Sequence, residues 1–223
     1  MSQQTQPPVF LIFGMQGSGK GTQSKLLQER YHLSHLAPGD IFREEIALNT
    51  ELGLKIKEYV TTGRLVPDEI TIAVLREYFK KPSSNGWILD GFPRNQAQQE
   101  GLDALLQELG FHVAAAIYLD IDDTEVTKRL LGRRICATCK AVYNIYTNPP
   151  KLENVCDSCG GNLEKRSDEN EEAIKQRIAI YKEKTEPLLE RYRQQGVLLN
   201  INGSLPIDQV QKEVIENIDE RIQ

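Results

Sequence analysis

The sequence predicts an α/β fold in which a parallel sheet of five strands is flanked by helices. Short apolar segments alternate along the chain with longer amphipathic segments, and a glycine-rich loop joins the first apolar segment to the first amphipathic one. The chain has 223 residues, which is enough for one sizeable α/β core with one or two small insertions. Because strands joined by helices form right-handed crossovers, we expect these strands to be parallel.

The first strand is predicted at residues 9–13, VFLIF, where five apolar residues without polar alternation are typical of a central strand covered on both faces. Further strands are predicted at residues 33–36, 87–89, 113–121 and 197–201. Helices are predicted after the glycine-rich loop and at residues 41–48, 52–60, 67–78, 95–109, 122–131 and 206–222, with a long helix from about Asp168. Pro187 is expected to kink or divide that long helix.

Turn residues mark several of these boundaries. Asp40 follows a Pro-Gly turn and is expected to cap a helix, while Gly63 is expected to end one. Pro67 is expected in the first turn of the next helix, where its missing N–H costs nothing. Residues 1–8 are expected to be a frayed start.

The glycine-rich loop GMQGSGKGT predicts a nucleotide-phosphate site. Its glycines allow the backbone to turn tightly and to bring several amide N–H groups round one anion, and Lys20 adds a positive charge at the start of the next helix. The spacing from Gly14 to Gly19-Lys20 matches the phosphate-loop signature, although Gly21 stands where Ser or Thr is usual and Thr22 comes one position later. The predicted fold class is therefore P-loop NTPase-like.

Composition narrows the class of function. Hydrophobic residues make up 39% and charged residues 26%, an ordinary globular composition, and the net charge of −5 argues against general nucleic-acid affinity. The sequence has no apolar run of about twenty residues and no signal-peptide pattern at its start. We therefore expect a cytoplasmic protein with neither nucleic acid nor membrane as a partner.

Four cysteines predict a structural metal site. Cys136 and Cys139 form one CxxC pair and, after sixteen residues, Cys156 and Cys159 form a second, so that four thiolates can close on one tetrahedral Zn2+. Little apolar surface is available in this loop-rich segment, so the metal would supply the missing stability. Iron in the same site, two disulfides and inert thiols are the alternatives. A zinc ribbon that binds nucleic acid is disfavoured, because the segment lacks a basic stripe interleaved with aromatic residues.

Six motifs along nearly the whole chain resemble the adenylate kinase family in order and spacing. They are GSGKGT, Gly39-Asp40 with Arg43, GRLVPDE at 63–69, LDGFPR at 89–94, GRR at 132–134 and Arg166-Ser-Asp-Glu. The four-cysteine segment is similar to the zinc-bearing lid of many bacterial adenylate kinases. The resemblance implies a core at residues 1–36, 67–132 and 170–223, an NMP-binding insertion at 37–66 and a zinc-binding lid at 133–169.

The resemblance also implies which residues bind the two nucleotides. The ATP site would comprise Gly17, Ser18, Gly19, Lys20, Gly21, Thr22, Arg129, Arg133, Val142, Tyr143 and Leu205. The AMP site would comprise Pro38, Arg43, Arg64, Leu65, Val66, Gly91, Phe92, Pro93, Arg94, Gln98, Arg166 and Arg177. Of these, Lys20, Arg94, Arg129, Arg133, Arg166 and Arg177 would be catalytic, Gln98 would read the adenine of AMP, and Asp90 would orient water on Mg2+.

These residue types suit phosphoryl transfer, which depends on positioning and charge neutralisation more than on a general base. Arg129 and Arg133 would share one helical face if the helix continues that far. The histidines His32, His35 and His112 are scattered and are expected to be structural, so no phosphorylated intermediate is expected.

The expected reaction is Mg2+-dependent, reversible transfer of the terminal phosphoryl group of ATP to AMP, giving two ADP, in a monomer. Two departures from the family are noted: Met15-Gln16 stands where Ala-Pro is common, and Ala37-Pro38 stands where Ser-Thr is common. Pro38 lacks the hydroxyl that helps to frame AMP, which leaves base selectivity open. A pyrimidine monophosphate kinase and a catalytically silent AMP/ATP sensor are the alternative functions.

Overall fold

The computed structural model describes residues 7–81, 85–166 and 170–222. Its core is a five-stranded sheet in the order β2-β3-β1-β4-β8, with every neighbouring pair parallel. The strands are β1 (Pro8–Phe13), β2 (Ser34–Leu36), β3 (Trp87–Asp90), β4 (His112–Asp120) and β8 (Leu198–Asn202). The predicted α/β class and all five predicted core strands are confirmed, and β1 is the central strand.

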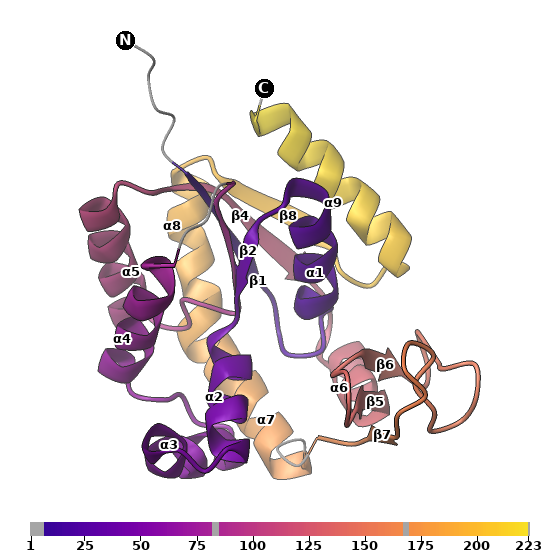
Figure 1. Cartoon of the computed structure of the whole chain (residues 1–223). Coiled ribbons are helices and arrows are strands. Elements are labelled where there is room, and N and C mark those ends of the chain that lie inside the picture. Colours follow the sequence, from indigo (N-terminus) through magenta and orange to yellow (C-terminus); the bar gives the residue numbers. More distant parts are fainter. Residues whose placement is uncertain (1–6, 82–84, 167–169, 223) are drawn as a thin grey trace.

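Helices cover both faces of this sheet, because alternate residues of β1 point to opposite sides. Leu11 and Phe13 pack in one buried cluster with residues of α4 (Asp68–Phe79), α5 (Gln96–Leu109) and α8 (Leu189–Gln194). Phe10 and Ile12 pack in another cluster with α1 (Lys20–Tyr31) and α9 (Ile207–Ile222). Figure 1 shows these two helical layers on either side of the strands. Burial on both faces explains why β1 has no polar alternation.

A small helical insertion follows β2 and contains α2 (Pro38–Ala47) and α3 (Glu51–Thr62). Helix α3 ends at Gly63, which adopts a left-handed conformation with φ 78°, as predicted. The predicted cap at Asp40 is wrong. Ala37 caps α2 and Pro38 occupies its first turn, so Asp40 lies inside that turn and its carboxylate is available to neighbouring cations.

A second insertion carries the four cysteines. It follows α6 (Asp123–Gly132) and forms a small antiparallel sheet of β5 (Arg133–Cys136), β6 (Val142–Asn144) and β7 (Leu163–Glu164) in the order β6-β5-β7. The sequence predicts only the five core strands and misses these three, because strands of two to four residues leave little periodic signal. In Figure 1 this cysteine insertion projects away from the core sheet.

The chain returns to the core through α7 (Glu171–Ile180), which Asn170 caps. The helix start predicted near Asp168 lies outside the described residues, as do residues 1–6 of the predicted frayed start. For Pro8 that prediction is wrong, since Pro8 begins β1 and pairs with His112. Helix α7 continues into a π-helical turn, Tyr181–Thr185, and a 3-10 turn, Glu186–Leu188, before α8. The predicted division at Pro187 is confirmed, and it begins before the proline because that residue supplies no N–H to the preceding turn.

Within the described residues, no helix is both long and apolar enough to cross a membrane.

Candidate active site

A cleft of about 1140 Å3 lies where the carboxyl ends of β1 and β3 meet the two insertions. Ligands collect at this edge of open parallel sheets. The cleft brings together most of the residues predicted from the sequence: Gly17, Ser18, Gly19, Lys20, Gly21, Thr22, Arg43, Leu65, Asp90, Gly91, Pro93, Arg94, Arg129, Arg133, Val142, Tyr143, Arg166, Arg177 and Leu205. Residues separated by more than 180 positions in the chain thus share one cavity.

Five predicted residues are absent from the cleft wall in the part of the chain that the structure describes: Pro38, Arg64, Val66, Phe92 and Gln98. Val66 and Phe92 are buried in the hydrophobic clusters, and Pro38 is buried at the start of α2. The Arg64 side chain is ion-paired with Glu58 instead. Gln98 is buried, and its side-chain oxygen accepts a hydrogen bond from the backbone N–H of Arg94.

The loop between β1 and α1 has backbone conformations that glycine permits. Gly14 has φ 140°, and a Cβ atom there would lie 2.5 Å from Ser18 Oγ and 2.8 Å from the Leu119 carbonyl oxygen. Helix α1 starts at Lys20 without a side-chain cap, and Ser18 Oγ is buried with no hydrogen-bond partner among the described residues. Uncapped N–H groups and an orphaned hydroxyl fit a bound anion.

Lys20 lies over this loop. Its Nζ donates to the carbonyl oxygens of Gly14 at 2.8 Å and Met15 at 2.9 Å. Burial lowers the pKa of Lys20 to about 8; Asp90 opposes the shift, and the charges of nearby arginines add to it. The site therefore concentrates positive charge at an energetic cost that a polyphosphate would relieve.

Asp90 ends β3 beside Lys20, and His35 Nε2 lies 3.7 Å from Asp90 Oδ2. Burial alone would raise the pKa of Asp90, but His35 and Lys20 outweigh it and hold that pKa below its usual value. The sequence alone predicts only a structural role for His35. Pairing of β2 with β3, which sets His35 opposite Ile88, is the signal that could have placed it near Asp90.

Six arginines reach the cleft, from α2, α6, β5 and α7 and from the loops after β3 and β7. Desolvation by the surrounding cleft walls, with nearby Arg177 and Arg43, lowers the pKa of Arg94 to about 10, and its Nε donates to the Gly91 carbonyl at 2.6 Å. Asp40 accepts hydrogen bonds from Arg43 and Arg166, and so joins α2 to the end of the cysteine insertion. Such clustering of like charges is typical of a site for a multiply charged anion.

Two further arginines lie at the joint between α6 and the cysteine insertion. Arg129 donates to Glu125 at 2.8 Å and to the Gly203 carbonyl at 2.9 Å. Helix α6 ends at Gly132, so Arg133 belongs to β5. The condition for a common helical face, that the helix continues to Arg133, is therefore not met, although both side chains line the cleft.

The four cysteine sulfurs lie within 4.8 Å of one another. Cys136 Sγ is 3.5 Å from Cys159 Sγ, and Cys139 Sγ is 3.5 Å from Cys156 Sγ. Disulfide sulfurs are about 2.05 Å apart, which excludes bonded pairs here. Four thiolates round one Zn2+ lie about 3.8 Å apart, given Zn–S bonds of about 2.3 Å. The donor set therefore fits a closed four-sulfur metal site.

Tyr143 connects that cluster with the cleft. Its hydroxyl accepts from Asp157 N at 2.9 Å and lies 3.5 Å from Cys156 Sγ, so its polar end faces the sulfurs. Neighbouring Val142 is 52% exposed and lines the cleft, as does Tyr143.

Comparison with known proteins decides the family. The family model described as adenylate kinase matches residues 12–197. The chain belongs to the adenylate kinase family.

Curated relatives agree over almost the full chain. The adenylate kinase of Archaeoglobus fulgidus is 46% identical over 96% of this chain and 98% of its own length. That of Acetivibrio thermocellus is 44% identical over 92% and 95%, and that of Clostridioides difficile is 42% identical over 92% and 96%. The chain is thus a phosphotransferase of the nucleoside monophosphate kinase class, and the predicted resemblance is confirmed.

The structure gives a physical account of the first departure from the adenylate kinase pattern. Met15 is buried, and it packs with Val126 and Leu130 of α6 and with Ile174 of α7 and Tyr181. It therefore joins the phosphate loop to both helices that flank the cysteine insertion. For the second departure, Pro38 suits the first turn of α2 because that position needs no N–H donor.

Proposed function

We propose that this protein catalyses reversible, direct in-line transfer of the terminal phosphoryl group of ATP to AMP, giving two ADP. The observation that carries the proposal is the convergence of Lys20 and six arginines on one cleft beside an uncapped glycine-rich loop. Transfer between two nucleotides gathers many negative oxygens, and cations fixed in advance stabilise the charge that develops on them.

On the ATP side, amide groups of residues 17–22 hold the phosphate chain and Lys20 contacts its transferring end. When the phosphates arrive, Lys20 Nζ exchanges its two carbonyl partners for phosphate oxygens. Arg129 and Arg133 approach from α6 and β5, while Val142, Tyr143 and Leu205 border the adenosine.

On the AMP side, Arg43 and Arg94 hold the phosphate, and Arg166 and Arg177 approach the transferring group. Arg177 also donates to the Val60 carbonyl at 3.0 Å, which ties α7 to the end of α3. The remaining residues of this site are Pro38, Arg64, Leu65, Val66, Gly91, Phe92, Pro93 and Gln98. A Cβ atom at Gly91 would lie 3.2 Å from Arg94 and 3.6 Å from Lys20, so glycine keeps the path between the two cations open.

Mg2+ carried with ATP would neutralise phosphate charge. Mg2+ retains several waters and takes one or two carboxylates, which suits the carboxylate of Asp90, at the end of β3 in the cleft. The lowered pKa of Asp90 keeps this group ionised at neutral pH, so it can accept hydrogen bonds from metal-bound water.

The cysteine insertion is proposed to be a lid, residues 133–169, that closes over ATP and excludes water, with Cys136, Cys139, Cys156 and Cys159 holding one structural Zn2+. Without closure, water would compete with AMP for the phosphoryl group. Residues 37–66 are proposed as the NMP-binding part, and residues 1–36, 67–132 and 170–223 as the core. We further propose a cytoplasmic monomer.

A coupled assay that detects ADP tests the reaction. The purified protein is supplied with Mg-ATP and, separately, with AMP, CMP, UMP and GMP, and AMP is expected to be the preferred acceptor. Turnover of CMP or UMP without AMP would assign a pyrimidine monophosphate kinase instead. Nucleotide binding with no turnover at all would assign a sensor.

A further inference from the structure

Both polar atoms of the Gln98 side chain have fixed partners. Gln98 lies in the first turn of α5 and is only 2% exposed. Its Nε2 donates to Asp68 Oδ1 at 2.8 Å, and its Oε1 accepts from the backbone N–H of Arg94 at 2.9 Å. The amide is thus held from two sides.

These two partners allow one orientation of the amide. A backbone N–H can only donate, so the atom that faces Arg94 N must be the oxygen. An ionised carboxylate can only accept, so the atom that faces Asp68 must be the nitrogen. A flipped amide would set donor against donor and acceptor against acceptor, and both polar atoms of the buried Gln98 amide would lose their hydrogen bonds.

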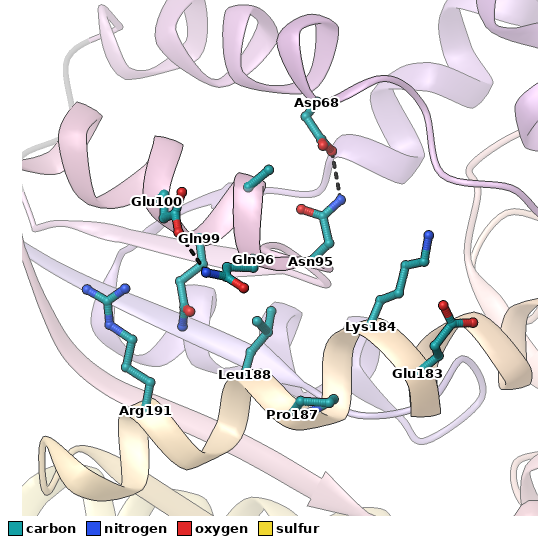
Figure 2. A pocket seen from close by; sticks show the side chains of 11 residues that line it. Asp68, Asn95, Gln96, Gln99, Glu100, Glu183, Lys184, Pro187, Leu188 and Arg191 are labelled. Atoms are coloured by element: carbon teal, nitrogen blue, oxygen red, sulfur yellow. Dashed lines mark hydrogen bonds between the residues drawn. The ribbon is translucent and has the colours of Figure 1, made fainter.

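Asp68 is itself held in place. Asn95 Nδ2 donates to Asp68 Oδ1 at 2.9 Å, a hydrogen bond that Figure 2 shows beside a second cavity, of about 630 Å3. Asn95 Oδ1 in turn accepts from Gln98 N at 2.8 Å and caps α5. The starts of α4 and α5 are therefore joined by a closed set of hydrogen bonds whose only carboxylate is Asp68.

We propose that Asp68 is a positioning residue for base selection, because it locks the Gln98 amide with a donor and an acceptor in fixed places. This inference rests on the proposed role of Gln98 in reading the AMP base. Each amide atom retains one further hydrogen-bonding position: a second hydrogen on Nε2 and a second lone pair on Oε1. That pair complements a ring nitrogen acceptor beside an amino group, as in adenine.

The locked amide also rejects other bases. Hypoxanthine and guanine present a ring N–H beside a carbonyl oxygen, which is the reverse pattern. Pairing with them would require the amide to flip, and the flip would break the bonds to Asp68 and Arg94. A site with buried polar groups that the wrong substrate leaves unpaired discriminates strongly against it.

The test compares AMP and IMP as phosphoryl acceptors for the wild-type enzyme and Asp68→Ala. The ratio of kcat/KM for AMP over IMP is expected to fall about tenfold in Asp68→Ala, the effect of about one hydrogen bond. The KM for ATP should stay unchanged, because Asp68 lies outside the ATP cleft. IMP is also measured as a competitive inhibitor against AMP, in case its turnover is too slow to detect.

Matched variants distinguish an effect on the position of the Gln98 amide from a general loss of structure. Asp68→Asn retains an oxygen that can accept both bonds and should keep most of the selectivity. Glu69→Gln removes the neighbouring exposed acid and should change neither nucleotide preference nor rate. Asn95→Ser keeps a capping oxygen but loses the bond to Asp68, so a fall of about threefold in the ratio is expected.

The outcomes distinguish this inference from the proposed function. A wild-type enzyme that does not phosphorylate AMP would overturn the proposed function. A wild-type enzyme that does so, with an AMP/IMP ratio in Asp68→Ala within twofold of the wild type, would overturn the role of Asp68 alone. If Asp68→Ala does not fold, Asn95→Ser decides, and an unchanged ratio in that variant contradicts the inference.

Discussion

The phosphate loop and the cysteine insertion are both rich in glycine and polar residues, yet different forces order them. The phosphate loop lies between β1 and α1, and residues of both elements are buried in the two large clusters on either face of the core sheet. The described buried cluster of the cysteine insertion contains only Cys136, Tyr143, Cys156 and Leu163, with Ala141 packed against it. Apolar burial can therefore order the phosphate loop, whereas we expect the cysteine insertion to need a metal ion bound by its four sulfurs.

Substitution of Lys20 by Met is expected to have the largest effect, and to act on catalysis alone. Turnover should fall by about 10^3-fold, because a cation aimed at the transferring group is lost. Folding stability should not fall, since burial already disfavours the charged form of Lys20 and lowers its pKa to about 8. Steady-state kinetics and denaturant unfolding of the same samples check both parts.

Lys25→Met is a useful comparison, because Lys25 is another cleft-lining lysine of α1 that has no assigned part in the reaction. It should retain activity within a few-fold. Near-normal turnover in Lys20→Met would contradict the catalytic role of Lys20. A large loss of stability would contradict the inference that packing of the core, and not Lys20, orders the loop.

Removal of the metal should affect the cysteine insertion and spare the core. Elemental analysis should find about one zinc per chain. In Cys156→Ser, one of four ligands is lost, and amide hydrogen exchange in residues 133–166 should rise at least tenfold while exchange in β1 and β4 stays unchanged. Activity should fall with the loss of an ordered lid.

Ser158→Ala is the matched variant, because Ser158 lies between Cys156 and Cys159 but is not itself a proposed metal ligand. It should retain the metal and the slow amide exchange of the insertion. Finding no metal in the wild-type protein, together with oxidised sulfurs, would contradict the zinc site. If amide exchange in the insertion were as slow in Cys156→Ser as in the wild type, apolar packing would be sufficient to order the insertion.

The difference between the two regions also explains what the sequence could predict. The core strands were predictable because burial on both faces leaves unbroken apolar runs such as residues 9–13. The cysteine positions were predictable from spacing, but the strands beside them were missed. Those strands are two to four residues long and are set by backbone pairing such as Ile135 with Val142 and Glu164, which leaves no period in the sequence.

Site residues divide in a similar way. The position of Lys20 over the glycine-rich loop was predictable, because the spacing of the loop fixes it. His35 was missed because its proximity to Asp90 depends on strand order, which one sequence does not specify residue by residue. The hydrogen bonds of Asp68 were missed for the same reason, since they join the starts of two helices 27 positions apart.

The smallest expected effect concerns Met15, which packs the phosphate loop against the two helices that flank the cysteine insertion. Met15→Ala restores the residue that many family members have, but it leaves a cavity between the phosphate loop and helices α6 and α7. The free energy of unfolding should fall by about 2–4 kcal/mol, as for other large-to-small substitutions in cores. Met15→Leu conserves volume and should cost less than about 1.5 kcal/mol. Because α6 and α7 lead into and out of the cysteine insertion, the cavity should also raise the KM for ATP several-fold, whereas Leu should leave it near the wild-type value. Denaturant titration and ATP kinetics measure the two effects, and an alanine variant as stable as the leucine variant would show that Met15 does not brace this joint.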